Sequence, residues 1–132
     1  MTATPRAIEL TEIAALAAAE KLANEIVAYD VSDQLAITDA FLLCSGANDR
    51  QVRSIIDEVE LKLKQAGATL VRREGEQEGR WVLLDYNDIV VHVQNGEERV
   101  FYALERIWKD CPLIPLPDAV TVGNSAANGD ER

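Results

Sequence analysis

The feature that most constrains the fold is a pair of apolar segments, residues 80–86 and 89–93, separated by Asn87-Asp88. Asparagine tolerates the positive φ angles of tight hairpin turns, so the two segments are expected to pair as antiparallel strands. Side chains alternate between the faces of a strand, so Trp81 and Leu83 lie on the face opposite to Val82 and Leu84. Both faces of this hairpin are apolar, so the sheet needs cover on both sides.

Helical and strand-like periods alternate along the rest of the chain. A first helix is expected over 5–27, where apolar residues recur every three or four positions. A second is expected between an N-cap at Asn48 and a C′ glycine at Gly67, and a third between Asn95 and Pro112. Three further strands are expected over 28–31, 38–44 and 69–73.

The resulting order, α-β-β-α-β-β-β-α, predicts an α/β (α+β) fold in a single domain, with a mixed, mostly antiparallel five-stranded sheet flanked by helices. We expect the domain to span 1–117 and a disordered tail to follow over 118–132, where small polar and charged residues dominate. The first and last helices could flank one face of the sheet, leaving a patch around Trp81 for a second subunit or another protein. The simpler interpretation is that Trp81 fills the core.

Charge and cysteine content argue against several classes of function. The chain carries 23 acidic and 13 basic residues, a net charge of −10, so its field repels nucleic-acid backbones and anionic lipid. No apolar run reaches the ~20 residues of a membrane span, and acidic residues interrupt the N-terminal region before it could form an export signal. Cys44 and Cys111 are too few for a disulfide framework. We therefore expect a cytoplasmic protein that binds neither membrane nor nucleic acid directly.

Few side chains are arranged for catalysis. His92 lies in an apolar strand without an adjacent nucleophile, which favours a hydrogen-bonded structural histidine. Asp85 and Asp88 flank the hairpin turn, where solvated carboxylates are commoner than a cation site. Ser45-Gly46, with Arg50 nearby, could offer backbone amides to an anion, but a plain strand-to-helix turn explains it equally well. Because the chain also lacks phosphate-binding glycine motifs and an Asp-x-Asp pair, we expect no enzyme activity, cofactor or metal.

A series of short segments between about Ile8 and Pro115 forms a recognisable pattern. No single segment is distinctive, but their order and spacing along the chain together form a specific pattern. The segments are Asp30-Val31, Ile37-Thr38-Asp39-Ala40-Phe41, Ser45-Gly46, Arg50-Gln51, Gly75, Gly79-Arg80-Trp81, Asp85-Tyr86-Asn87-Asp88, Val90-Val91-His92-Val93, Arg99, Tyr102, Leu104-Glu105 and Trp108. The pattern resembles the ribosomal silencing factor family, also called Iojap-like proteins. Asn87 departs from the glycine that many relatives have, although asparagine can adopt the same left-handed conformation.

The resemblance implies a nucleotidyltransferase-like fold without catalytic carboxylates, and a homodimer in solution. It also implies binding to the large ribosomal subunit through ribosomal protein fourteen at the inter-subunit face. The small subunit could then not join, and translation would fall when nutrients are scarce. By position, we expect the partner contacts at Trp81, Leu83, Asp85, Tyr86, Asp88, His92 and Arg50.

Two alternatives remain open at the level of sequence. The implied fold, together with Asp85 and Asp88, would suit a nucleotidyltransferase-like enzyme with metal-dependent nucleotide binding. A dimeric adaptor in ribosome assembly is the other alternative, in which Trp81 serves dimerisation alone and the ribosome is bound elsewhere. Titration with ATP and magnesium tests the first, and the oligomeric state of Trp81→Ala tests the second.

Overall fold

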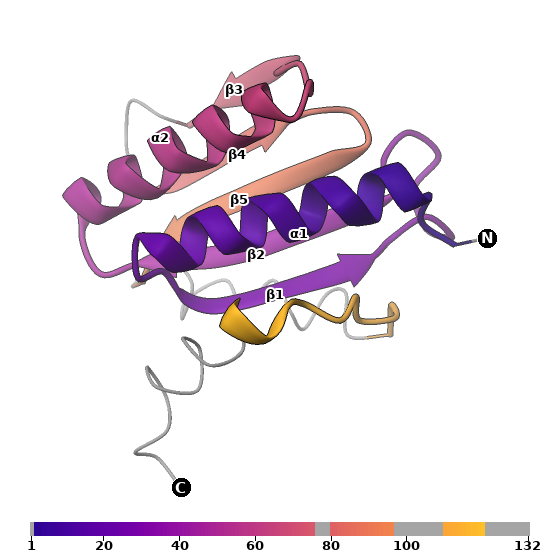
Figure 1. Ribbon diagram of the computed structural model, residues 1–132, viewed down its shortest axis with the longest axis horizontal. Coiled ribbons are helices and arrows are strands. Elements are labelled where there is room, and N and C mark those ends of the chain that lie inside the picture. Colours follow the sequence, from indigo (N-terminus) through magenta and orange to yellow (C-terminus); the bar gives the residue numbers. More distant parts are fainter. Residues whose placement is uncertain (1, 76–79, 97–109, 121–132) are drawn as a thin grey trace, which may run out of the picture.

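A five-stranded mixed sheet forms the centre of the structure, a computed structural model that describes residues 2–75, 80–96 and 110–120 (Figure 1). The strands are β1 (Asn24–Asp30), β2 (Ala40–Gly46), β3 (Arg72–Glu74), β4 (Trp81–Asp85) and β5 (Ile89–Asn95). They lie in the order β1-β2-β5-β4-β3. Only β2 and β5 run parallel, and the other three pairs are antiparallel, so the predicted mixed, mostly antiparallel sheet is confirmed.

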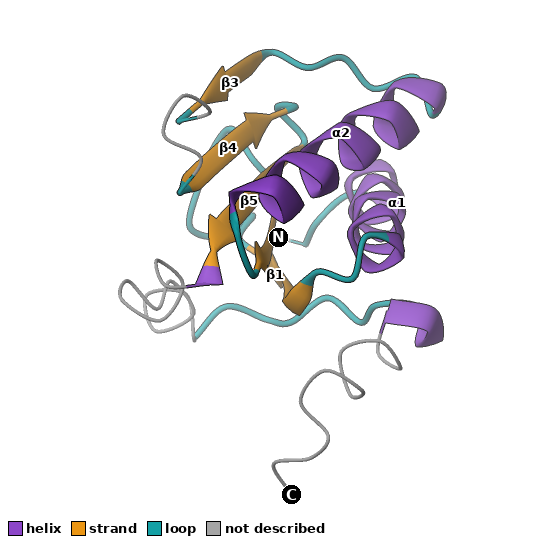
Figure 2. Ribbon diagram, turned by 90° about the vertical axis from the view of Figure 1, so that its left-hand side faces the viewer, coloured by secondary structure: helices purple, strands orange, loops and turns teal. Residues whose placement is uncertain are grey.

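Helices α1 (Pro5–Glu20) and α2 (Asp49–Gln65) lie side by side on one face of this sheet (Figures 1 and 2). Both begin at a capping side chain: Thr4 accepts a hydrogen bond from the Ala7 amide, and Asn48 from the Gln51 amide. Most of the buried residues of α1 are alanines, so this helix can approach the sheet closely. The expected final helix, and Trp108 within it, lie outside the described residues.

The first helix is shorter than predicted, and the first strand is correspondingly longer. Residues 5–27 were expected to be helical, but α1 ends at Glu20 and β1 begins at Asn24. Leu22 has a φ of 64°, a left-handed conformation that no α-helix can include. Ile26 and Val27 fall on the three-to-four period of the helix by coincidence, and their β-branched side chains suit the strand in which they lie.

The other strand boundaries shift by a few residues. β2 and β5 each continue two residues beyond the expected ends, because they pair with each other up to Gly46 and Asn95. The strand predicted over 69–73 is only the three-residue β3, all of it exposed. An edge strand without a buried face leaves little apolar alternation in the sequence.

Two apolar clusters cover the two faces of the sheet. The larger lies between the sheet and both helices, and includes Val82, Leu84 and Tyr86. The smaller lies on the opposite face around Phe41 and Leu43, with Trp81 and Leu83 packed against it. The predicted alternation along β4 is therefore confirmed, and both faces of the sheet are apolar.

The segment after residue 110 closes the outer edge of β1. The Asp30 amide donates to the Pro112 carbonyl at 2.8 Å, and the Ile114 amide donates to the Ala28 carbonyl at 2.9 Å. Packing extends past the predicted domain boundary at residue 117, because residues 118–120 form a helical turn and Val120 is fully buried. Residues 121–132 of the expected tail lie outside the described residues. In the described part of the chain, no helix has the length and apolar character needed to cross a membrane.

Candidate partner-binding face

Trp81, Leu83 and Asp85 occupy one face of β4, the face that α1 and α2 do not cover. Each of the three side chains is partly exposed, whereas Val82 and Leu84 between them are fully buried. A partly exposed tryptophan beside a partly exposed leucine gives a compact apolar surface with an acidic residue at one end. We call Trp81, Leu83 and Asp85 the β4 face.

His92, on the neighbouring strand β5, contacts the Trp81 side chain of the β4 face. It pairs with Leu83 across β4 and β5, and it is only 5% exposed. The Trp81 Nε1–H donates to His92 Nδ1 at 3.3 Å, and the Phe41 ring meets the imidazole edge-on, with centroids 4.8 Å apart. A nitrogen that accepts this bond carries no proton, so the imidazole is fixed in one tautomer. The expected structural histidine is thus present, and it orients the indole.

Asp85 and Asp88 both shape the hairpin turn. Asp85 Oδ1 accepts a hydrogen bond from the Asn87 amide at 2.8 Å, and its other oxygen lies 3.5 Å from the Arg72 guanidinium. Asn87 has a φ of 70°, the left-handed conformation expected where relatives have glycine. Asp88 is exposed, and its carbonyl accepts from the Asp39 amide. The Asp85 carboxylate and the Asp88 backbone carbonyl therefore stabilise the turn at one end of the β4 face.

Tyr86 and Arg50 lie away from the β4 face. Tyr86 belongs to the core on the helix-covered side of the sheet and is 6% exposed. Arg50 is exposed on the first turn of α2, which packs on that same side. Membership of one hairpin places residues near one another in sequence, but strand alternation sends Tyr86 to the opposite face from Trp81. The seven expected contact residues are thus not gathered on one surface.

Gln94 is a buried polar residue that the sequence did not reveal. It pairs with Trp81 across β4 and β5 and is fully buried. Neither atom of its side-chain amide has a hydrogen-bond partner in the part of the chain that the structure describes. The sequence predicts a strand that ends at residue 93, which leaves Gln94 outside it. Only an alternation of apolar and polar residues that continued to residue 95 would indicate that Gln94 lies in the strand.

Within residues 2–75, 80–96 and 110–120, no three His, Cys, Asp or Glu side chains are grouped as a metal would require. The strongest titration effect among the candidate residues is at Tyr86, where burial, followed by the nearby Glu60 carboxylate, raises the pKa to about 12. Its hydroxyl therefore remains protonated at neutral pH and can donate a hydrogen bond.

Comparison with known proteins gives a consistent family. The family model described as "Ribosomal silencing factor during starvation" matches residues 4–132. A ribosomal silencing factor of Bacillus subtilis is 40% identical over 107 residues, which cover 81% of this chain and 91% of the relative. One from Halalkalibacterium halodurans is 36% identical over 113 residues, covering 86% of this chain and 97% of the relative.

A solved structure agrees with the sequence comparison. The crystal structure of a Chromobacterium violaceum protein superposes with a TM-score of 0.73 at 33% identity, and the match covers 76% of this chain and 84% of that one. The fold, the family model and two relatives that align over most of their length all point the same way. The chain belongs to the ribosomal silencing factor family.

Proposed function

We propose that this protein silences translation by docking on the large ribosomal subunit, without catalysing a reaction. Its contact there is ribosomal protein fourteen at the inter-subunit face, and steric overlap then prevents the small subunit from joining. The family supports the silencing role, and the β4 face supports the mode of docking. The observation that carries the proposal is the partly exposed Trp81, oriented by its hydrogen bond to buried His92.

A pre-oriented aromatic side chain is well suited to anchor a protein interface. Tryptophan is among the residues that contribute most to binding energy, and an indole already held in one orientation loses little entropy on binding. Leu83 extends the apolar area, and Asp85 adds a carboxylate at its end. The net charge of −10 favours encounter with a basic ribosomal protein.

Tyr86, Asp88 and Arg50 enter this proposal differently. Asp88 contributes its backbone carbonyl to the turn next to the β4 face, and its exposed carboxylate would act on docking only from that end of the face. Tyr86 and Arg50 lie on the helix-covered side, so they would touch the ribosome only if the bound subunit reached around the edge of the sheet. We further propose that the free protein is a cytoplasmic homodimer.

Gradient sedimentation with purified large subunits tests the docking mode. Wild-type protein should migrate with the large subunit, and Trp81→Ala should stay near the top of the gradient. Leu61→Ala is the matched control, because Leu61 is also a partly exposed apolar residue but lies on α2. Circular dichroism must show that both variants fold. If folded Trp81→Ala migrates with the subunit as wild type does, the β4 face is not the docking surface.

A subunit-joining assay tests the mechanism. Large subunits incubated with wild-type protein should form fewer complete ribosomes on addition of small subunits, and Trp81→Ala should restore joining. Silencing by subunit anti-association is refuted if wild-type protein binds large subunits and joining proceeds at its normal level.

A further inference from the structure

A cavity of about 310 Å³ opens on the side of the sheet opposite to the β4 face. It lies between the C-terminal half of α2 and the segment that leads from α2 to β3. Its walls are mostly apolar, since the Tyr86 ring and the side chains of Leu70 and Ala68 form much of them. The lining residues are Glu60, Lys64, Ala68, Thr69, Leu70 and Tyr86. This size and character match the lower end of small-molecule sites in proteins.

Tyr86 gives the cavity a hydrogen-bond donor. The side chain is more than nine-tenths buried, at 6% exposed, and it lines the cavity. Its hydroxyl makes no hydrogen bond with the residues that the structure describes, and it is accessible from the cavity, so water or a ligand can reach it. A ligand oxygen that accepts this hydrogen bond would replace water there, which gives a modest net gain.

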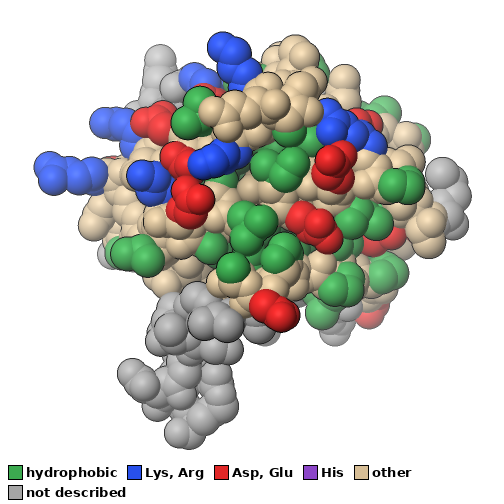
Figure 3. Space-filling model, viewed as in Figure 1, with side chains coloured by type: hydrophobic (Ala, Val, Ile, Leu, Met, Phe, Trp, Pro, Cys, Tyr) green, Lys and Arg blue, Asp and Glu red, His purple; other side chains and the backbone are tan. Residues whose placement is uncertain are grey.

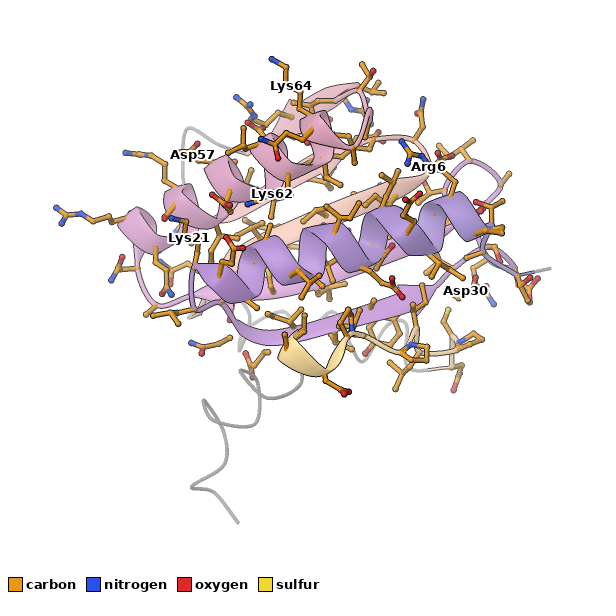
Figure 4. All side chains as sticks on the ribbon, viewed as in Figure 1. Arg6, Lys21, Asp30, Asp57, Lys62 and Lys64 are labelled. Carbon is orange, nitrogen blue, oxygen red and sulfur yellow. The ribbon has the colours of Figure 1, made fainter. Side chains whose placement is uncertain are left out.

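The two charged residues of the lining differ in whether they are already paired. The Glu60 carboxylate accepts a hydrogen bond from Arg73 Nε at 2.8 Å, which offsets part of its charge. Lys64 has no ion pair within the described part of the chain, and Figure 4 shows it pointing outward from α2, away from α1. Lys62, by contrast, lies between the two helices and pairs with Glu58 at 2.6 Å. The cavity therefore presents one unpaired positive charge.

The cationic character extends around the cavity. In Figure 3 lysine and arginine side chains lie over α2 and near the ends of α1, with acidic side chains between them. Arg6 reaches the end of α2 as well, donating to the Ala66 carbonyl at 2.7 Å. An anionic ligand is thus favoured here over a cationic one.

We propose that this cavity binds a small aromatic carboxylate. The ring would pack against Tyr86, Leu70 and Ala68, while the carboxylate would reach the Lys64 ammonium and a ligand oxygen would accept from the Tyr86 hydroxyl. The site lies on the opposite side of the sheet from the β4 face, so a ligand could occupy it while the protein is docked. The proposal goes beyond translational silencing and does not depend on it.

Nuclear magnetic resonance of the isolated, isotope-labelled protein tests the site, with 2-naphthoate as the probe. Amide signals of residues 68–70 and 86 should shift in a saturable way, and 2-naphthylmethylamine, which has a similar ring but a positive charge, should cause little change. Equal effects of the two probes, or no saturable shift with 2-naphthoate, would overturn the proposal. Because no ribosome is present, the result is independent of the silencing function.

Matched variants separate the two polar contacts. Lys64→Gln should weaken 2-naphthoate binding about two- to fivefold, the range for an exposed ion pair, while Lys62→Gln on the same helix should not. Tyr86→Phe keeps the ring and should weaken binding about two- to tenfold by removing one hydrogen bond. Tyr29→Phe, at an equally buried tyrosine on the other face, is its control. Affinities that stay unchanged in both Lys64→Gln and Tyr86→Phe would refute this site.

Discussion

At the scale of single residues, Asp30 shows how much one carboxylate can organise. It accepts hydrogen bonds from the Ala3 amide at 2.8 Å and from the Ser32 hydroxyl at 2.6 Å. Burial raises the pKa of the Asp30 carboxyl, but these hydrogen bonds and the one from the Ser32 amide outweigh it, so the pKa lies below its usual value. The carboxylate thereby ties the segment before α1 to the end of β1.

Asp30→Ala should lower the free energy of unfolding at pH 7 by about 1–3 kcal/mol, the range for hydrogen bonds to a charged group. A depressed pKa in the folded state stabilises the fold above the pKa of the unfolded chain, about 4, and this stabilisation is lost as pH falls through the folded value. The difference between wild type and Asp30→Ala in urea unfolding should therefore shrink below about pH 4. Asp57→Ala, at an exposed carboxylate of α2, is the control. A difference that is constant down to acid pH would contradict this account.

Gly75 is the residue where a side chain is least tolerated. Its φ is +82°, and a Cβ added there would lie 2.2 Å from the Trp81 carbonyl oxygen, so the backbone itself would have to move. Gly75→Ala should lower the thermal midpoint by an amount corresponding to more than about 1 kcal/mol. Gly96→Ala is the control, because its Cβ would meet only the Gly46 carbonyl at an ordinary 3.5 Å. Equal midpoints for the two variants would show that the β3–β4 connection adapts freely.

At the scale of elements, α2 depends on the residues at its start. The Asn48 side chain caps the helix, and Gln51 does more, because its amide donates to the carbonyls of Lys21 and Leu22 at 3.0 Å each. The start of α2 is thereby joined to the end of α1. Both residues come from one capping motif, so a local signal also fixes how the two helices meet.

Asn48→Ala should lower the free energy of unfolding by about 1 kcal/mol, the usual value of a lost N-cap. Asn48→Asp should recover most of the loss, since aspartate caps as well as asparagine and also suits the positive end of the helix dipole. Chemical denaturation of the three proteins measures this. Equal stability of Asn48→Ala and wild type would mean that the cap contributes nothing here.

Local signals decided which elements could be predicted from the sequence. The bounds of α2 follow from Asn48 and Gly67, because a cap and a left-handed glycine act within a few residues. The end of α1 does not, because Leu22 takes a left-handed conformation that nothing in its neighbourhood demands. The face shared by Trp81, Leu83 and His92 follows from strand alternation. Strand alternation also separates Tyr86 from this face, whereas proximity along the hairpin does not distinguish the two faces.

The cavity beside Tyr86 was beyond sequence reasoning for a different reason. Its existence depends on how far α2 stands from the segment over 68–70, and such a distance is set by packing across the whole layer. Lys64 looks like any exposed helical lysine until the structure shows that its neighbour Glu60 already has Arg73 as a partner. Lys64 is therefore distinguished by its neighbours in the folded structure and not by its residue type.

At the scale of the whole molecule, the net charge of −10 should speed encounter with the basic ribosomal protein, although it repels ribosomal RNA. Raising the salt concentration from about 0.05 to about 0.5 M shortens the screening length and should slow association with isolated ribosomal protein fourteen several-fold. Trp81→Ala should instead act mainly by speeding dissociation. The Trp81 side chain becomes buried only after the two partners have met, so its contacts affect the dissociation rate more than the association rate. Surface plasmon resonance with immobilised ribosomal protein fourteen separates the two rates. An association rate that is insensitive to salt would mean that the net charge plays no part in encounter.

The parallel pairing of β2 with β5 has a consequence for the chain as it is synthesised. β2 is apolar and completely buried, yet its central neighbour β5 is made only after α2, β3 and β4 have appeared. Until then the backbone amides and carbonyls on one edge of β2 are unpaired. A partial chain can therefore pair with an exposed strand of another chain and aggregate. Because the centre of the sheet closes last, a nascent chain halted before residue 95 should be a client for chaperones, whereas one released later should not.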